Sequence, residues 1–69
     1  MDDKVLNIKA LAANGNESIA ELAKRAGINS DHLYNVSAGR AVMTAEDLVR
    51  LSIATGVPER NIQREYTAP

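Results

Sequence analysis

Residues 19–39 read IAELAKRAGINSDHLYNVSAG and contain two short helical patterns separated by a glycine. Gly27 lies at the position where a tight turn favours a positive φ, which costs glycine little. Ala23 is small at the point where the second helix must approach the first. The small and apolar positions of the two patterns are Leu22, Ala23, Ile28, Leu33 and Val36. This spacing predicts two short helices that cross at a steep angle.

Both helices are predicted to begin at capping residues. Ser18 and Glu21 fit a capping box at the start of the first helix, which is expected to run to the residue before the turn glycine. The second helix is capped by either Asn29 or Ser30 and ends at Gly39. Two helices joined by such a turn form a helix-turn-helix, whose second helix can enter the major groove of duplex DNA.

The segment before these helices predicts one more helix. An apolar face runs from about Asp3 to Ala13, carried by Val5, Leu6, Ile8 and Leu11. Asp2 and Asp3 suit the positive N-terminal end of such a helix. The Asn-Gly-Asn run at residues 14–16 then predicts a turn.

The segment after Gly39 predicts a loop followed by two further helices. Thr44 caps the first of them, which Gly56 closes. Its first turn holds Glu46 and Asp47, and its apolar positions are Leu48, Val49, Leu51 and Ile53. Val57 and Ile62 can staple a last short helix at about residues 58–63. We therefore expect an all-α, compact bundle of about five short helices.

Length and composition indicate one small domain over residues 1–64, with residues 65–69 as a frayed tail. A chain of this size buries only about 60% of the surface that its unfolded form exposes, so its stability should be marginal. The chain has 69 residues and no cysteine, which excludes disulfides and thiolate metal sites. No signal peptide or long apolar run is present, so we expect a soluble, cytoplasmic protein with no membrane partner.

Charge is the one property that does not favour nucleic-acid binding. The formal net charge is -1, whereas many DNA-binding domains are basic. The chain nevertheless has eight Lys and Arg residues, and their distribution over the surface matters more than the sum. The net charge therefore argues against strong non-specific binding rather than against DNA binding itself.

Residues 18–62 resemble the Cro/repressor-type helix-turn-helix family of phage and bacterial regulators. The matching positions are Ser18, Leu22, Ala23, Gly27, Ile28, Leu33, Val36, Gly39 and Arg40, followed by the helix that ends at Gly56-Val57. The resemblance implies an all-α domain that binds operator DNA, usually as a dimer, and regulates transcription. With no second domain, the chain looks most like a stand-alone Cro-like protein.

The resemblance also assigns roles to individual residues. The third helix presents to DNA the positions that reach base edges or flanking phosphates, which here are Ser30, Asp31, Tyr34 and Asn35. Arg40 occupies a place where relatives often carry a cation near the phosphate backbone. The amides that follow the caps Ser18 and Asn29 would hold further phosphates.

The chain departs from the family at two places. Ile19 replaces a glutamine that in relatives contacts a phosphate, and we expect it to pack against the first helix instead. The arginine-glutamate pair that braces many relatives is also missing, because Ser37 stands at the glutamate position and Leu11 or Ala12 at the arginine position. One phosphate contact and one structural brace are therefore lost.

Three residues of the third helix each have two interpretations. Asn35 can bond to both N6 and N7 of adenine, or it is a solvated polar residue. Tyr34 contacts a phosphate or a thymine methyl, or it covers the core. Asp31 accepts a hydrogen bond from cytosine N4, or it complements the positive N-terminus of its helix.

The remaining polar candidates are also open. Ser30 is either a cap or a phosphate contact, and Arg40 is a phosphate contact. His32, the only histidine, is expected to be solvated or to face the backbone rather than DNA. Lys24 and Arg25 are expected on a solvated face of the second helix.

We expect no enzyme activity, because no set of nucleophile, base and orienting residue is visible in the sequence. No cofactor or metal site is predicted either. The predicted function is sequence-specific binding of double-stranded operator DNA, as a homodimer on DNA that is weak or monomeric in solution. Its seam is expected over residues 57–66, through Val57, Pro58, Ile62 and Tyr66. The alternative is a protein-interaction module of the same fold, with an antitoxin-like or antirepressor role.

Overall fold

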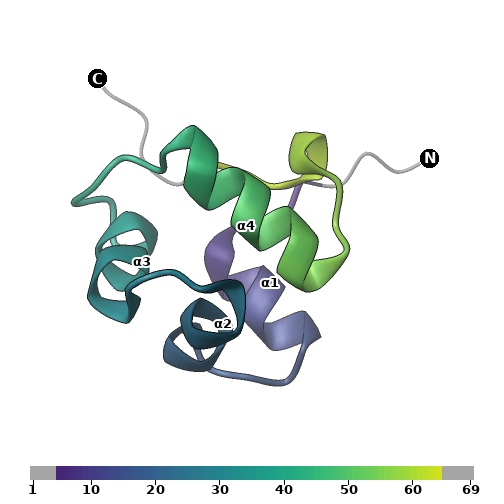
Figure 1. Ribbon diagram of the computed structural model, residues 1–69, viewed down its shortest axis with the longest axis horizontal. Helices are drawn as coiled ribbons and strands as arrows, with labels where there is room; N and C mark the ends of the chain where they lie inside the picture. The colour runs from purple at the N-terminus through teal and green to yellow at the C-terminus, as the bar shows by residue number, and fades with distance from the viewer. Residues whose placement is uncertain (1–4, 65–69) are drawn as a thin grey trace.

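Four capped α-helices and one short 3-10 turn make up residues 5–64, the part of the chain that the computed structural model describes (Figure 1). The elements are α1 (Ile8–Asn14), α2 (Ile19–Ala26), α3 (Ser30–Ser37), α4 (Ala45–Thr55) and the 3-10 turn η1 (Glu59–Asn61). No strand occurs within these residues. The all-α class is therefore confirmed, with one α-helix fewer than expected.

The helices begin where local sequence signals place them. The Ser18 hydroxyl accepts a hydrogen bond from the Glu21 amide at 3.1 Å, and the Glu21 carboxylate accepts one from the Ser18 amide at 2.9 Å. Thr44 and Asp47 make the same reciprocal pair at the start of α4. Of the two candidate caps for α3, Asn29 is the one used, since its Oδ1 accepts from the third amide along at 3.0 Å.

A left-handed glycine ends α2, as predicted. Gly27 has φ +75°, and the next amide, that of Ile28, donates to the Ala23 carbonyl at 2.8 Å. This bond satisfies a carbonyl that the last turn of the helix would otherwise leave free. Gly56 ends α4 in the same conformation, with φ +77°. The chain thus reverses between α2 and α3 within three residues.

The first helix is shorter than predicted and begins later. It starts at Ile8 rather than near Asp3, because Asn7 caps it through a 2.8 Å hydrogen bond from the Ala10 amide to Oδ1. Leu6 is extended instead of helical: its amide donates to the Asn61 carbonyl and its carbonyl accepts from the Gln63 amide, both at 2.8 Å. The predicted Asp2 and Asp3 at the helix start lie outside the described residues.

An aliphatic core joins the helices, with α2 packed against α1, α3 and α4 (Figure 1). Ala23 is fully buried, as the predicted close approach of the helices requires. Ile19 is half-buried and packs against this core, in line with its expected inward role. Met43 is also buried, although it lies in the loop that precedes α4. The fully buried large side chains are Ile8, Leu11, Leu22, Leu33, Val36, Met43 and Leu51.

Of the residues expected at the dimer seam, the structure describes Val57, Pro58 and Ile62. Ile62 is only 5% exposed, and Val57 is half-buried against the core. Ile62 lies beside Leu6 in the interior, whereas Val57 keeps part of its surface exposed and Pro58 is exposed. Tyr66 lies outside the described residues. The expected last helix over residues 58–63 is reduced to the three-residue turn η1.

Candidate nucleic-acid interface

Helix α3 has one face in the core and one face in solvent. Leu33 and Val36 are fully buried, whereas Ser30, Asp31 and Tyr34 are exposed. Tyr34 is 58% exposed, so the interpretation that it covers the core is wrong. The outer face of α3 therefore offers an aromatic ring, a hydroxyl and a carboxylate to a partner.

Asn35 and Arg40 lie together at the C-terminal end of α3. The Arg40 amide donates to the Asn35 carbonyl at 2.8 Å, and Arg40 Nε donates to Asn35 Oδ1 at 3.4 Å. Asn35 is half-buried and Arg40 is exposed. The second bond is long and exposed, so both side chains can exchange it for a stronger partner.

The caps at the starts of α2 and α3 use their side-chain oxygens within the chain. Ser18 Oγ and Asn29 Oδ1 each accept a backbone amide, so one of the two lone pairs on each oxygen is already used within the chain. Ser30 is not the cap, and its exposed hydroxyl follows Asn29 at the first position of α3. Amides in the first turn of a helix have no partner within the helix. Because Asn29 Oδ1 takes the His32 amide, those of Ser30 and Asp31 are the ones that can donate to an anion.

The charge around α2 and α3 is balanced rather than positive. The exposed cations on or next to these helices include Lys24 and Arg40, and the exposed carboxylates are Glu21 and Asp31. Helix α3 itself has no lysine or arginine. A basic face is the usual electrostatic footprint of a DNA-binding domain. The balanced charge of this surface does not favour strong general attraction to phosphates.

His32 is not simply solvated, which corrects the sequence interpretation. Its Nε2 lies 2.7 Å from Asp47 Oδ2, so the side chain joins α3 to the first turn of α4. Asp47 is 7% exposed and is the one buried charged residue among residues 5–64. Burial raises the pKa of Asp47, but hydrogen bonds from His32 and Thr44 outweigh it and hold that pKa below its ordinary value.

The lowered pKa of Asp47 predicts acid sensitivity. A carboxylate whose pKa is lower in the folded chain stabilises the fold fully above its unfolded pKa, about 4, and this contribution is lost as the pH falls through the folded value. Asp47→Asn should therefore lower the free energy of unfolding at neutral pH, and the gap to the wild type should narrow below about pH 4. Urea unfolding across this range measures the gap. Two stability curves that stay parallel to about pH 2 would contradict the assignment.

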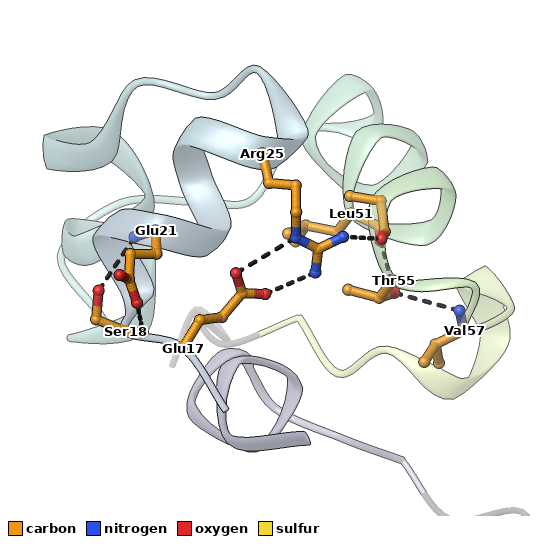
Figure 2. Close-up of polar contacts among 8 residues, drawn as sticks. Glu17, Ser18, Glu21, Arg25, Leu51, Thr55 and Val57 are labelled. Atoms are coloured by element: carbon orange, nitrogen blue, oxygen red, sulfur yellow. Dashed lines mark hydrogen bonds and ion pairs between the residues drawn. The ribbon is translucent and has the colours of Figure 1, made fainter. Parts of the chain in front are cut away.

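Arg25 is exposed on α2, as expected, and its guanidinium is also bonded within the chain. Its Nη2 and Nε lie 2.6 and 3.3 Å from the two carboxylate oxygens of Glu17, and its Nη1 donates to the Ala54 carbonyl at the end of α4 (Figure 2). These hydrogen bonds hold the pKa of Glu17 below its ordinary value. Arg25 thus joins α2 to the segment before it and to α4. The prediction for Lys24, which is exposed, is confirmed.

Arg50 is also hydrogen-bonded within the chain. Its guanidinium bonds to Glu46 at 2.7 and 3.1 Å, and Nη1 lies 3.5 Å from the Gly27 carbonyl. The outer face of the same helix is apolar, with Val49 and Ile53 exposed, Ile53 to 78%. Neither the pairing of Arg50 with Glu46 nor the exposure of Val49 and Ile53 was predicted. The i,i+4 spacing of Glu46 and Arg50 is the one sequence signal that could have indicated the ion pair.

The described part of the chain has little concave surface. One hollow of about 120 Å3 lies beside Leu11 and Thr55, and another of about 180 Å3 lies beside Ala26 and Ile53. Ligand pockets usually measure about 300–1,000 Å3. Residues 5–64 also contain no group of three or more side chains suited to hold a metal ion. None of the helices in this range has the length and apolar character needed to cross a bilayer.

Comparison of the chain with models of protein families, with curated proteins and with solved structures found no match.

Proposed function

We propose that this protein is a sequence-specific regulator that binds double-stranded operator DNA, with α2 and α3 acting as a helix-turn-helix and α3 in the major groove. One observation carries the proposal. Helix α3 is anchored by Leu33 and Val36 while its outer face, with Ser30, Asp31 and Tyr34, is exposed and polar. An exposed polar helix on a packed support, following a tight turn, is what major-groove recognition requires.

In this proposal the contacts divide into two kinds. Asn35 and Tyr34 face base edges, and the base-reading role of Asn35 follows from its capacity to donate and accept at adenine. Arg40 and the first amides of α3 hold phosphates, which fix the position of the helix but do not read sequence. No cofactor takes part, and regulation follows from occluding or recruiting polymerase.

Substitutions of Asn35 and Arg40 should distinguish a residue that reads a base from one that holds a phosphate. Asn35→Ala should relax the preference at one base-pair position by about 1–3 kcal/mol, because a bidentate base contact is lost. Arg40→Ala should weaken binding to all sequences alike and reduce the salt slope by about one, because a phosphate contact is lost. Titration of operator and random duplexes at several salt concentrations measures both effects. If Asn35→Ala weakens both duplexes equally, Asn35 does not read a base.

A two-fold dimer on DNA is part of the proposal. One short helix reads too few base pairs to find a site in a genome, and two copies would place their reading helices about 34 Å apart. With Ile62 buried and Val57 half-buried, the described C-terminal segment offers a small apolar surface for pairing. We expect monomers at micromolar concentration without DNA and two chains per palindromic duplex with it. Sedimentation measures both states, and a one-to-one complex on a palindrome would exclude the dimer.

Chemical-shift mapping tests the proposed surface directly. Addition of a random duplex at low salt should shift the amides of Ser30, Asp31 and Arg40 and leave those of Val49 and Ile53 unchanged. The two sets lie on different elements, α3 with its following loop and the outer face of α4. Absence of any shift at low salt would count against DNA binding.

The alternative is a protein-interaction module of the same fold. Two observations favour it: α3 carries Asp31 and no cation, and the outer face of α4 exposes Val49 and Ile53. An exposed apolar pair on a helix is more typical of a protein partner than of DNA. Shifts confined to Val49 and Ile53 on addition of a protein partner, with no response to DNA, would support this function.

A further inference from the structure

One hydrogen-bonded contact joins α3 to α4 within residues 5–64. His32 Nε2 lies 2.7 Å from Asp47 Oδ2, and the same oxygen accepts the Thr44 amide at 3.1 Å. Asp47 Oδ2 therefore bonds to two segments: to the Thr44 amide in the capping box of α4, and to His32 in the first turn of α3. The described residues contain no other side-chain hydrogen bond between these two helices.

The covalent link between α3 and α4 is not helical. The chain between α3 and α4 runs through Gly39, at φ +83°, and residues 40–44 are not helical. Its main anchor is Met43, which is buried. The orientation of α3 therefore depends on its packing against α2 and on the contact between His32 and Asp47.

The chemistry of the contact fixes which atom carries the proton. An ionised carboxylate only accepts hydrogen bonds, so His32 Nε2 must donate. Asp47 is 7% exposed, and a buried carboxylate that lost this donor would be left with one acceptor site unsatisfied. The other charged groups on α3, on α4 and on the loop between them are Asp31, Arg40, Glu46 and Arg50, and Arg40 and Arg50 have partners of their own.

We propose that His32 and Asp47 are positioning residues that fix the direction in which α3 projects from the domain. Asp47 holds the imidazole through Nε2, and the imidazole holds the first turn of α3 against the start of α4. The consequence for DNA, a sharper discrimination between operator and random sequence, rests on the proposed function. The positioning of α3 itself does not, and it can be measured without DNA.

Nitrogen NMR of the single histidine tests the contact. At about pH 8 the neutral ring of the wild type should populate the Nε2–H tautomer more fully than free histidine, which already favours it, because Asp47 accepts from that atom. Asp47→Asn should reduce this bias, since the amide is a weaker acceptor than the carboxylate. Glu46→Gln, which changes the adjacent carboxylate in the same turn, should leave the tautomer unchanged. An unbiased ring in the wild type, or one that Asp47→Asn does not alter, would overturn the proposal.

Hydrogen exchange tests the positioning of α3. In His32→Ala the amides of Leu33 and Val36 should exchange several-fold faster relative to those of α2, because α3 loses its attachment to α4. His32→Gln should restore slow exchange, since its side-chain amide can also donate to Asp47. Equal acceleration throughout the domain would show general destabilisation and would contradict a specific role.

Duplex titration then separates this proposal from the proposed function. His32→Ala should reduce the ratio of operator to random affinity by several-fold, with rescue in His32→Gln, whereas Arg40→Ala should leave the ratio unchanged. If His32→Ala leaves this ratio unchanged, the contact between His32 and Asp47 does not contribute to sequence discrimination. If the wild type binds no DNA at low salt, the proposed function fails, and the tautomer and exchange results alone decide the positioning role.

Discussion

Ala23→Leu should lower the free energy of unfolding by about 1–3 kcal/mol. Ala23 is fully buried in α2, where that helix meets α3, and its carbonyl accepts from the Ile28 amide at 2.8 Å. Three additional carbon atoms have no space there, so the two helices must separate or adopt strained side-chain conformations. A small domain loses about 4–8 °C in melting temperature for each kcal/mol, so thermal unfolding detects the change readily.

Ala20→Leu is the matched control for this substitution. Ala20 lies on the same helix but is exposed, so the larger side chain extends into solvent. Its effect should stay within about 0.5 kcal/mol. Equal melting temperatures for Ala23→Leu and Ala20→Leu would show that residue 23 is not at the contact between α2 and α3. Under the proposed function, Ala23→Leu also weakens DNA binding, because the two helices move apart.

Gly27→Val should be the second strongly destabilising change. Gly27 has φ +75°, and a β-branched residue in this conformation costs at least about 1–2 kcal/mol. The new Cβ would also lie 3.0 Å from Arg50 Nη1, which now bonds to the Gly27 carbonyl. The arginine must move away, so the valine variant loses this contact in addition to the backbone strain.

Gly27→Asn separates backbone strain from side-chain bulk. Asparagine tolerates a left-handed conformation better than other residues with a side chain, so its loss of stability should be the smaller of the two. Denaturant unfolding of both variants gives the comparison. A Gly27→Val protein with the stability of the wild type would contradict the left-handed end of α2.

Local signals in the sequence predicted most helix boundaries. The capping boxes at Ser18 and Thr44 and the left-handed glycines at Gly27 and Gly56 depend on residues within one or two turns. Such signals can be read without knowledge of the rest of the fold. The start of α1 could not be read in this way, because Leu6 is held in an extended conformation by residues 61 and 63.

The polar contacts between distant residues could not be predicted. Glu17 and Arg25 are eight positions apart in the sequence, and His32 and Asp47 are fifteen apart. Before the helices are placed, each of these side chains fits a solvated surface equally well. Hydrophobic pattern predicted which residues fill the core of α2 and α3, but not the burial of Met43 in a loop.

The candidate site was predicted in part. The exposure of Ser30, Asp31 and Tyr34 follows from the helical period, because Leu33 and Val36 define the buried side. The bond between Asn35 and Arg40 does not follow from that pattern, and it joins two residues that had been assigned separate roles. The roles of these residues toward DNA remain predictions from their chemistry.

Selection of bound sequences from a pool of random duplex DNA tests the proposed function most directly. A domain that reads the major groove with α3, in two copies, should enrich a pseudo-palindrome with half-sites about one helical turn apart. Asn35→Ala in the same selection should lose preference at one symmetric position. No enrichment even at low salt, where phosphate contacts are strongest, would contradict DNA recognition and favour the protein-interaction module.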